Sequence, residues 1–285
     1  MSRVHPLRIG LKLAPQVTTV EELRSLWRLA DDEGFDHVWN FDHLAAIAGD
    51  PTGDVLEAWT LLGAMAEATR RVRIGCMVTG NTYRHPAVLA KMAVTVDHLS
   101  AGRLELGLGA AWAELEHTML GLEFGTAGQR IARLEEACQM LELLFREERA
   151  SFDGRWYRLD AAIANPKPVQ RPGPPLWIGG SGERKTLRVV AKHADVWNGA
   201  GSDAAEFARL SGVLDRHCAD VGRDPAAIRR SAQVRYAGDD EAVLRSTEAL
   251  VGAGMSELVV IVRAGQAVAD GEALSRLLPR LRSLG

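Results

Sequence analysis

The sequence predicts an α/β protein with one domain over residues 1–285, a (β/α)₈ or TIM barrel. Strand-like and helix-like segments alternate from one end of the chain to the other, which is the pattern of a parallel sheet with helical crossovers. Eight segments of each kind can be placed. A length of 285 residues is also ordinary for such a barrel.

The first half of the chain supplies four strands. An apolar run at 7–13 predicts the first strand, and Thr18 and Thr19, with Glu21 and Glu22 three residues later, predict a capping box for a helix that ends at Gly34. Pro86 suits the first turn of another helix, which runs to residue 99. The remaining segments of this half are strands at 37–41, 72–78 and 104–109 and a helix at 55–69.

The second half continues the rhythm after an irregular stretch. We expect strands at 176–179, 195–198, 231–236 and 258–262, with helices at 186–192, 205–221, 241–251 and 272–284.

The irregular stretch, at about 122–175, is interpreted as an insertion over the barrel mouth after the fourth strand. It contains a predicted helix at 131–146 and Asp153-Gly154 between aromatic residues, which is a hairpin signal. A proline-rich run at 165–175 predicts an extended loop. Because the strand–helix rhythm resumes at once, we do not expect a domain boundary here.

The composition argues against a nucleic-acid-binding or membrane protein. With 47% hydrophobic and 25% charged residues and a net charge of −3, the chain offers no basic surface for nucleic acid and no attraction to an anionic membrane. The N-terminus lacks the apolar core of a signal peptide, no apolar run is long enough to span a bilayer, and three scattered cysteines form no metal or redox motif. We therefore expect a cytoplasmic enzyme or binder of small molecules.

In such a barrel, the catalytic residues lie at the C-terminal ends of the strands. Asp42 and His43 follow the second strand, so that an acid and an imidazole would project into the mouth, where the imidazole could move a proton near neutral pH. The alternative is that Asp42 caps the loop and His43 is merely exposed.

Small residues follow the third and fourth strands. Those after the third strand suit either a bulge that lets the backbone approach a flat ligand or a plain turn. Those after the fourth strand leave room for a ring, and the tryptophan among them either contacts the ligand or covers the rim of the barrel. These residues are Val78, Thr79 and Gly80, then Gly109, Ala110, Ala111 and Trp112.

A glycine-rich turn follows the fifth strand and opens a helix, at Gly179, Gly180, Ser181 and Gly182. Unpaired N–H groups and the positive end of a helix dipole suit a phosphate, whereas a tight turn with positive φ is the structural alternative. Asn198 and Arg263, at the ends of the sixth and eighth strands, are weaker candidates for facing a ligand.

Six segments, in order along the chain, resemble the luciferase-like monooxygenase superfamily, in particular its branch that uses the deazaflavin coenzyme F420. They are Phe41-Asp42-His43-Leu44, residues 83–91, residues 97–104, Gly107-Leu108-Gly109-Ala110-Ala111-Trp112, residues 165–170 and Ile178-Gly179-Gly180-Ser181-Gly182.

The resemblance implies a barrel with an insertion after the fourth strand, and a homodimer. It places Asp42 and His43 at the polar edge of the cofactor ring, with His43 as the proton donor and the catalytic residue. Residues Val78–Gly80 would form a bulge behind the ring, often with a non-proline cis peptide, Gly109–Trp112 would line the ring pocket, and Gly179–Gly182 would hold the phosphate.

This chain departs from the family's sugar-phosphate dehydrogenases, which carry a glutamate where it has Trp112. The departure removes an acid/base group and implies a less polar substrate. The resemblance favours hydride transfer with coenzyme F420, and the alternative on the same scaffold is an FMN-dependent monooxygenase.

Two other classes remain open. A metal-dependent barrel hydrolase needs about three His, Asp or Glu ligands at strand ends. Only Asp42 and His43 are placed to converge, so no metal site is predicted. A non-catalytic binder of the same cofactor is the other class, and the Asp42-His43 pair argues against it.

Overall fold

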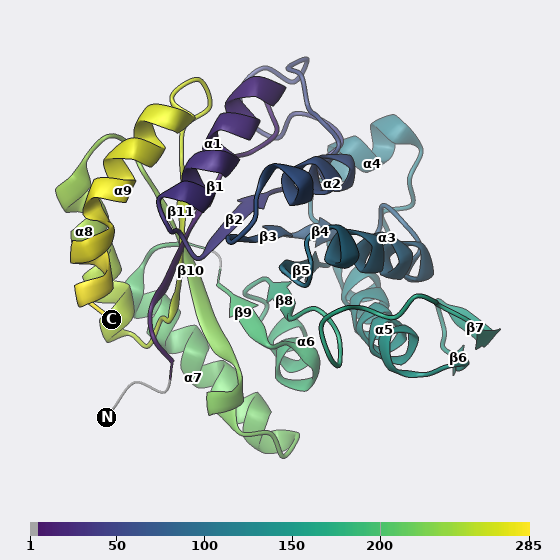
Figure 1. Ribbon diagram of the computed structural model, residues 1–285. Coiled ribbons are helices and arrows are strands. Elements are labelled where there is room, and N and C mark those ends of the chain that lie inside the picture. The colour runs from purple at the N-terminus through teal and green to yellow at the C-terminus, as the bar shows by residue number, and fades with distance from the viewer. Residues whose placement is uncertain (1–4, 200) are drawn as a thin grey trace.

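Eight parallel strands close into a barrel, which confirms the predicted fold class (Figure 1). The computed structural model describes residues 5–199 and 201–285. The barrel order is β3-β2-β1-β11-β10-β9-β8-β5, and pairing of β3 with β5 closes it. The strands are β1 (Arg8–Lys12), β2 (His37–Asn40), β3 (Arg73–Cys76), β5 (Leu104–Gly109), β8 (Leu176–Gly179), β9 (Val196–Asn198), β10 (Arg229–Arg235) and β11 (Glu257–Ile261).

Helices surround the barrel. They are α1 (Val20–Asp32), α2 (Ala58–Ala68), α3 (Pro86–Leu99), α4 (Glu114–Leu120), α5 (Ala127–Arg146), α6 (Thr186–His193), α7 (Ala204–Asp220), α8 (Asp240–Gly252) and α9 (Ala267–Ser283), with a 3₁₀ turn, η1, at Pro225–Ala227. The start of α1 follows the predicted capping signal, because the Thr19 side chain accepts a hydrogen bond from the Glu22 N–H.

The start of α9 was predicted five residues too late, at 272 instead of Ala267. Its first turn has no side-chain cap of its own. Instead, the Glu22 carboxylate on α1 accepts from the N–H groups of Gly265 and Ala267. The helix start is therefore satisfied by a residue more than 240 positions away, which no local signal reveals.

The third barrel strand is interrupted by a bulge. After β3, the short segment β4 (Thr79–Gly80) resumes pairing with the same neighbour, β5. Ile74 pairs with Leu104, and Thr79 pairs with Leu108. The chain therefore advances five residues from β3 to β4 while it advances four along β5. One extra residue in this strand is the signature of a β-bulge.

The insertion after β5 contains α4, α5 and an antiparallel hairpin of β6 (Ala150–Asp153) and β7 (Arg158–Ala162) that projects at one side of the molecule (Figure 1). The hairpin confirms the Asp153-Gly154 signal. Helix α5 begins at Ala127, four residues before the predicted start, with a capping box between Thr126 and Gln129. Helix α4 was not predicted, because its seven residues are too short for a clear apolar period.

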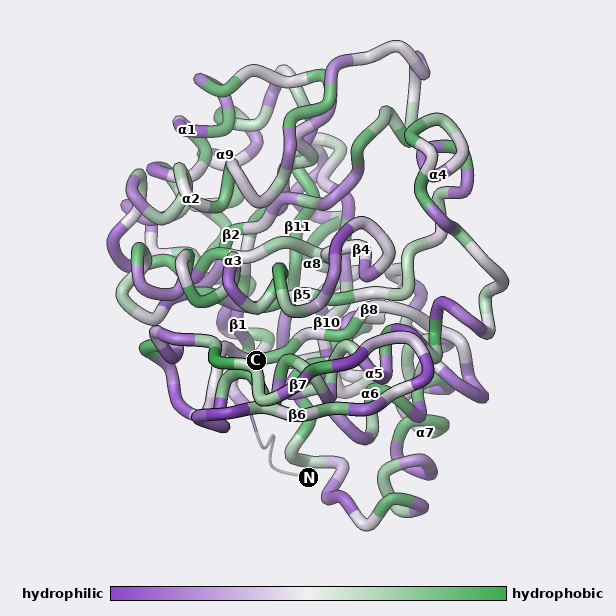
Figure 2. The backbone as a smooth tube through the Cα atoms, turned by 90° about the vertical axis from the view of Figure 1, so that its right-hand side faces the viewer, coloured by the Kyte–Doolittle hydropathy of each residue, from purple (hydrophilic) through white to green (hydrophobic). Residues whose placement is uncertain are grey.

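The core has two parts. One small cluster fills the barrel interior, built from Trp39, Met77, Trp177, Val196 and Val259. A much larger cluster lies between the strands and the helices. Figure 2 shows the corresponding pattern, with hydrophilic stretches mainly along the outer loops and outer sides of helices.

Buried carboxylates lie at the opening where the strands begin. Glu105 and Glu257 are at most 1% exposed and are paired with Arg8, Arg73 and Arg229. His37 Nε2 lies 3.1 Å from Glu257 Oε2. These paired buried charges close the end of the barrel where the strands begin. Active sites of such barrels lie at the other end, where the strands finish.

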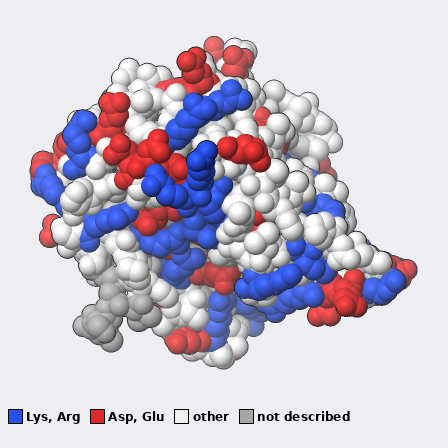
Figure 3. All heavy atoms as spheres, in the orientation of Figure 1, with Lys and Arg blue, Asp and Glu red and all other residues white. Residues whose placement is uncertain are grey.

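The surface carries both charge signs close together (Figure 3). Within the described residues, no helix combines the length and the apolar composition needed to cross a membrane.

Candidate active site

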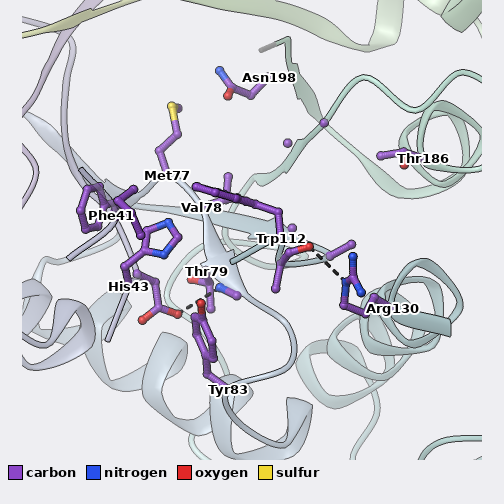
Figure 4. A pocket seen from close by; sticks show the side chains of 18 of the residues that line it. Phe41, His43, Met77, Val78, Thr79, Tyr83, Trp112, Arg130, Thr186 and Asn198 are labelled. Atoms are coloured by element: carbon purple, nitrogen blue, oxygen red, sulfur yellow. Dashed lines mark hydrogen bonds between the residues drawn. The ribbon is translucent and has the colours of Figure 1, made fainter. Parts of the chain in front are cut away.

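A cavity of about 440 Å³ opens at the ends of the barrel strands (Figure 4). It brings together eleven of the thirteen predicted site residues, which are Asp42, His43, Val78, Thr79, Gly80, Gly109, Ala110, Ala111, Trp112, Gly179 and Gly180. Ser181 and Gly182 do not line it. Its volume is that of a typical small-molecule site.

His43 lies directly after β2 and faces the cavity with a side chain that is 12% exposed. Its Nδ1 lies 2.8 Å from Oε1 of Glu116, on helix α4. A carboxylate at Nδ1 favours a proton on that nitrogen, which leaves Nε2 free to exchange a proton with a ligand. Among the described residues, Nε2 has no hydrogen-bond partner.

Glu116 is 1% exposed, and four groups are bonded to its carboxylate: the His43 imidazole, the Tyr83 hydroxyl and two backbone N–H groups. The N–H groups of Leu44 and Ala45 donate to its Oε2, and Tyr83 Oη donates to Oε1 beside His43. Burial by itself would raise the pKa of this carboxyl, but the hydrogen bonds from His43, Tyr83 and Leu44 outweigh it and hold the pKa below its ordinary value. Glu116 is therefore ionised at neutral pH.

Asp42 is buried at the cavity, and both of its carboxylate oxygens are bonded within the protein. Arg84 donates to both oxygens, at 2.5 and 2.9 Å, and the Gly80 N–H donates at 3.0 Å. The hydrogen bond and charge of Asp42 hold the pKa of Arg84 above its ordinary value, against the effect of burial. Asp42 thus anchors the backbone after the bulge to the end of β2.

The predicted bulge is present, and the peptide bond between Met77 and Val78 is cis. Val78 lines the cavity and lies against glycines of the two following barrel strands. A Cβ at Gly109 would lie 2.7 Å from Val78 Cγ2, and one at Gly179 would lie 3.2 Å from Cγ1. Glycine at both positions is what allows the Val78 side chain to form this wall.

The glycine-rich loop after β8 meets the cavity only at its first half. Gly180 has φ of 130°, and its N–H donates to Asn198 O at 3.2 Å, so this amide is not free for a phosphate. Among the described residues, the N–H groups of Ser181 and Gly182 have no partner. Thr186, the first residue of α6, lines the cavity beside the loop.

Trp112 is both wall and rim. Its side chain is 65% exposed, yet it lines the cavity and lies edge-on to His43, with ring centroids 5.5 Å apart. Ala111 adopts φ of 59°, and its carbonyl accepts from Arg130 Nε at 3.3 Å (Figure 4). The turn that carries Trp112 is therefore tied to α5 of the insertion.

Several site residues were not found from the sequence. The cavity is also lined by Lys12 from β1, Gln233 from β10 and Asn198 from β9. Of these three, the sequence indicated only Asn198 as a candidate. Lys12 was missed because the predicted strand, at 7–13, extended past it, whereas β1 ends at Lys12. Glu116 was missed because it lies on helix α4, which was not predicted. Arg263 does not line the cavity and is paired with Asp270.

No three His, Cys, Asp or Glu side chains within the described residues are grouped as they would be around a metal ion.

Comparison with known proteins identifies the family of this chain. The model of the luciferase-like monooxygenase family matches residues 2–281. The chain is 33% identical over 247 residues to F420-dependent glucose-6-phosphate dehydrogenase of Microbacterium testaceum, covering 85% of this chain and 72% of that protein. It is 28% identical over 242 residues to F420-dependent hydroxymycolic acid dehydrogenase of Mycobacterium tuberculosis, covering 84% of this chain and 66% of the relative.

Solved structures share the fold. An F420-dependent secondary alcohol dehydrogenase, in complex with an F420-acetone adduct, superposes with a TM-score of 0.89 at 18% identity, covering 97% of this chain and 99% of the other. The monooxygenase RslO1 of Streptomyces bottropensis gives 0.76 at 19% identity, covering 96% of this chain and 99% of the other. The match to the family model over nearly the whole chain confirms the resemblance seen in the six segments, and the chain belongs to the luciferase-like monooxygenase family.

Proposed function

We propose that this protein is an oxidoreductase that transfers a hydride between coenzyme F420 and a small organic substrate, with His43 as the proton-transferring residue. The observation that carries the proposal is the His43–Glu116 pair at the edge of a cavity walled by the Met77–Val78 bulge. Relatives from several organisms, at 28% to 34% identity, carry names of F420-dependent dehydrogenases, which supports F420 as the cofactor.

The residues present fit a flat ring with a phosphate-bearing tail. Val78 and the small residues Gly109, Ala110, Gly179 and Gly180 offer a smooth wall on which a ring could rest. The N–H groups of Ser181 and Gly182 lie beyond the part of the loop that lines the cavity. With no partner among residues 5–199 and 201–285, they could donate to the tail. They would hold the phosphate outside the cavity rather than in it.

The bound cofactor supplies the hydride donor or acceptor, and the protein supplies orientation and a proton. During oxidation of an alcohol, His43 Nε2 would accept the hydroxyl proton, and during reduction of a carbonyl it would return it. Glu116 keeps the imidazole oriented and compensates the charge that His43 gains when protonated. Asp42 and Arg84 hold the bulge that would support the ring.

The mouth favours a weakly polar substrate. Trp112, Ile47 and Ile131 line the cavity, with the Trp112 ring next to His43. The family resemblance implies a glutamate at the position of Trp112 in the sugar-phosphate dehydrogenases. We therefore include alcohols, ketones, aldehydes, imines and activated alkenes without charged groups in the proposed substrate class.

A turnover assay tests the proposal. Purified protein is incubated anaerobically with F420 and a panel of uncharged secondary and primary alcohols, and with reduced F420 and the matching carbonyls, imines and activated alkenes, while F420 fluorescence is followed. The proposal predicts loss or recovery of fluorescence with at least one pair. Oxygen consumption with reduced FMN and no reaction with F420 would instead identify a flavin monooxygenase.

A further inference from the structure

Lys12 is a buried cation in the wall of the cavity. It is the last residue of β1, it is 9% exposed, and it lines the same cavity as His43. The strands on either side, β2 and β11, present Trp39 and Ile261 at the paired positions, and neither is titratable. Lys12 therefore has an apolar neighbour on each side along the barrel wall.

One short chain of hydrogen bonds holds Lys12. Its Nζ donates to Gln233 Oε1 at 3.0 Å, Gln233 Nε2 donates to Asn198 Oδ1 at 2.9 Å, and Asn198 Nδ2 donates to Ser231 Oγ at 3.1 Å. Lys12, Gln233 and Asn198 all line the cavity, and in Figure 4 Asn198 lies on the opposite side of the view from Tyr83. This polar ladder is separate from the Asp42–Arg84 and His43–Glu116 pairs.

The charge of Lys12 has no counter-ion. Among the described residues, no carboxylate lies within ion-pair distance of Nζ, and Gln233 is its one hydrogen-bond partner. An ammonium group has three donors, and a buried charge without an opposite charge is costly. Burial lowers the pKa of Lys12 to about 8; Cys76 on β3 raises it and Arg235 on β10 lowers it further. A ligand that brings an electron-rich acceptor into the cavity would relieve this cost.

We propose that Lys12 is a positioning residue for the cofactor, whose ammonium donates to a negatively charged or strongly electron-rich atom of the bound ring. The inference rests on the proposed function, since it assigns the ring of F420 to the cavity. Lys12 and the ladder behind it would set the depth of the ring, while His43 stays free for the substrate. Lys12 is thus an electrostatic contact to the ring and moves no proton of the reaction.

The experiment measures F420 affinity by fluorescence titration for the wild-type protein and for Lys12→Met. The matched control is Lys91→Met, which removes a surface lysine of α3 that contacts the Asn165 carbonyl. Loss of a charge-assisted hydrogen bond should weaken binding of F420 by about 10- to 100-fold at pH 7 in Lys12→Met. Lys91→Met should bind within about twofold of the wild type.

Two further readouts separate this role from a merely structural one. The ratio of the Kd of Lys12→Met to that of the wild type should fall at least about tenfold between pH 7 and pH 9.5, because the unliganded wild type loses the Lys12 proton over this range. Titration of F420 itself affects both proteins and cancels in the ratio. The unliganded Lys12→Met protein should also melt at the same temperature as the wild type or higher, because an uncompensated buried charge has been removed.

The outcomes distinguish the two proposals. If the wild type does not bind F420, the proposed function fails. If the wild type binds F420 and Lys12→Met binds it equally well, or with a ratio that does not change with pH, the Lys12 proposal is overturned while the function stands. A lower melting temperature of unliganded Lys12→Met together with unchanged F420 affinity would assign Lys12 a structural role.

Discussion

His43 Nδ1 lies 2.8 Å from Glu116 Oε1, and this contact joins the end of barrel strand β2 to a helix of the insertion. The two residues are 73 positions apart in the sequence. Glu116 is also bonded by the N–H groups of Leu44 and Ala45, which follow His43 directly. One carboxylate therefore fixes both the imidazole and the loop that carries it.

Replacing His43 should abolish turnover without abolishing cofactor binding. We expect His43→Ala to lower kcat by about 100- to 10,000-fold, the range supplied by a positioned general acid or base, with the Kd for F420 changed only a few-fold. His98→Ala is the control, since His98 lies on the surface and contacts the Lys167 carbonyl. Steady-state kinetics and fluorescence titration give both values, and normal turnover in His43→Ala would refute its proton role.

Glu116→Gln should act through His43. The amide oxygen can still accept from Leu44 and Ala45, but the amide N–H₂ would face Nδ1 and favour the wrong tautomer of the imidazole. We expect kcat to fall about 100-fold and the pH–rate profile to change, with F420 affinity retained. Glu114→Gln, on the exposed side of the same helix, serves as the control. A kcat and profile like the wild type would mean that Glu116 does not orient His43.

Asp42→Asn should destabilise the protein. It would leave Arg84, whose side chain is 13% exposed, without its bidentate partner and weaken the anchor of the bulge. Breaking such a buried pair costs about 3 kcal/mol, whereas Asp32→Asn, which breaks an exposed pair with Arg71, should cost less than about 1 kcal/mol. Urea unfolding of the three proteins measures the difference. Equal free energies of unfolding would show that the pair does not hold the bulge.

Gly109→Ala should impair ligand binding through the bulge. The added Cβ would lie 2.7 Å from Val78 Cγ2, so the wall of the cavity must move. We expect F420 binding to weaken by about tenfold and stability to fall by about 1–3 kcal/mol, the usual cost of overpacking. Gly63→Ala on α2 meets no atom within 4 Å and should be neutral or stabilising. Unchanged binding by Gly109→Ala would show that the Val78 wall does not contact the ligand.

Lys12 should make stability depend on alkaline pH. Its pKa falls from 10.5 to about 8 on folding, so between these values the unfolded chain holds a proton that the native protein has released. The free energy of unfolding of the unliganded wild type should therefore rise relative to Lys12→Met by roughly 3 kcal/mol from pH 8 to pH 10.5. Denaturant titrations at pH 8, 9 and 10.5 measure this trend. A constant difference between the two proteins would contradict the lowered pKa.

Much of the fold could be predicted because each element carries a local signal. The strands at 104–109 and 176–179 and the helix from Pro86 to Leu99 coincide with the predicted bounds. Thr79 and Gly80 suited either a bulge or a plain turn after the third strand, and only the family resemblance favoured the bulge that the structure has. The early start of α9 could not, because its N–H groups are satisfied by Glu22, and neither could the short helix α4.

The candidate site shows the same division. Residues at strand ends, such as His43 and Gly109, could be found because a barrel brings those positions together. The partners that decide their roles could not. Asp42 lines the cavity, but its bonds to Arg84 and to the Gly80 N–H come from residues about 40 positions away and had no local signal. In the described part of the chain, the N–H groups of Ser181 and Gly182 are the ones left without a partner in the glycine-rich loop, because the Gly180 N–H donates to the Asn198 carbonyl.

Equilibrium titration of the purified protein with F420 and, separately, with FMN tests the central claim most directly, since the fluorescence of each ring reports its own binding. The account predicts saturable, stoichiometric binding of F420 and no comparable binding of FMN. Tight binding of FMN without binding of F420, or binding of neither ring, would contradict it.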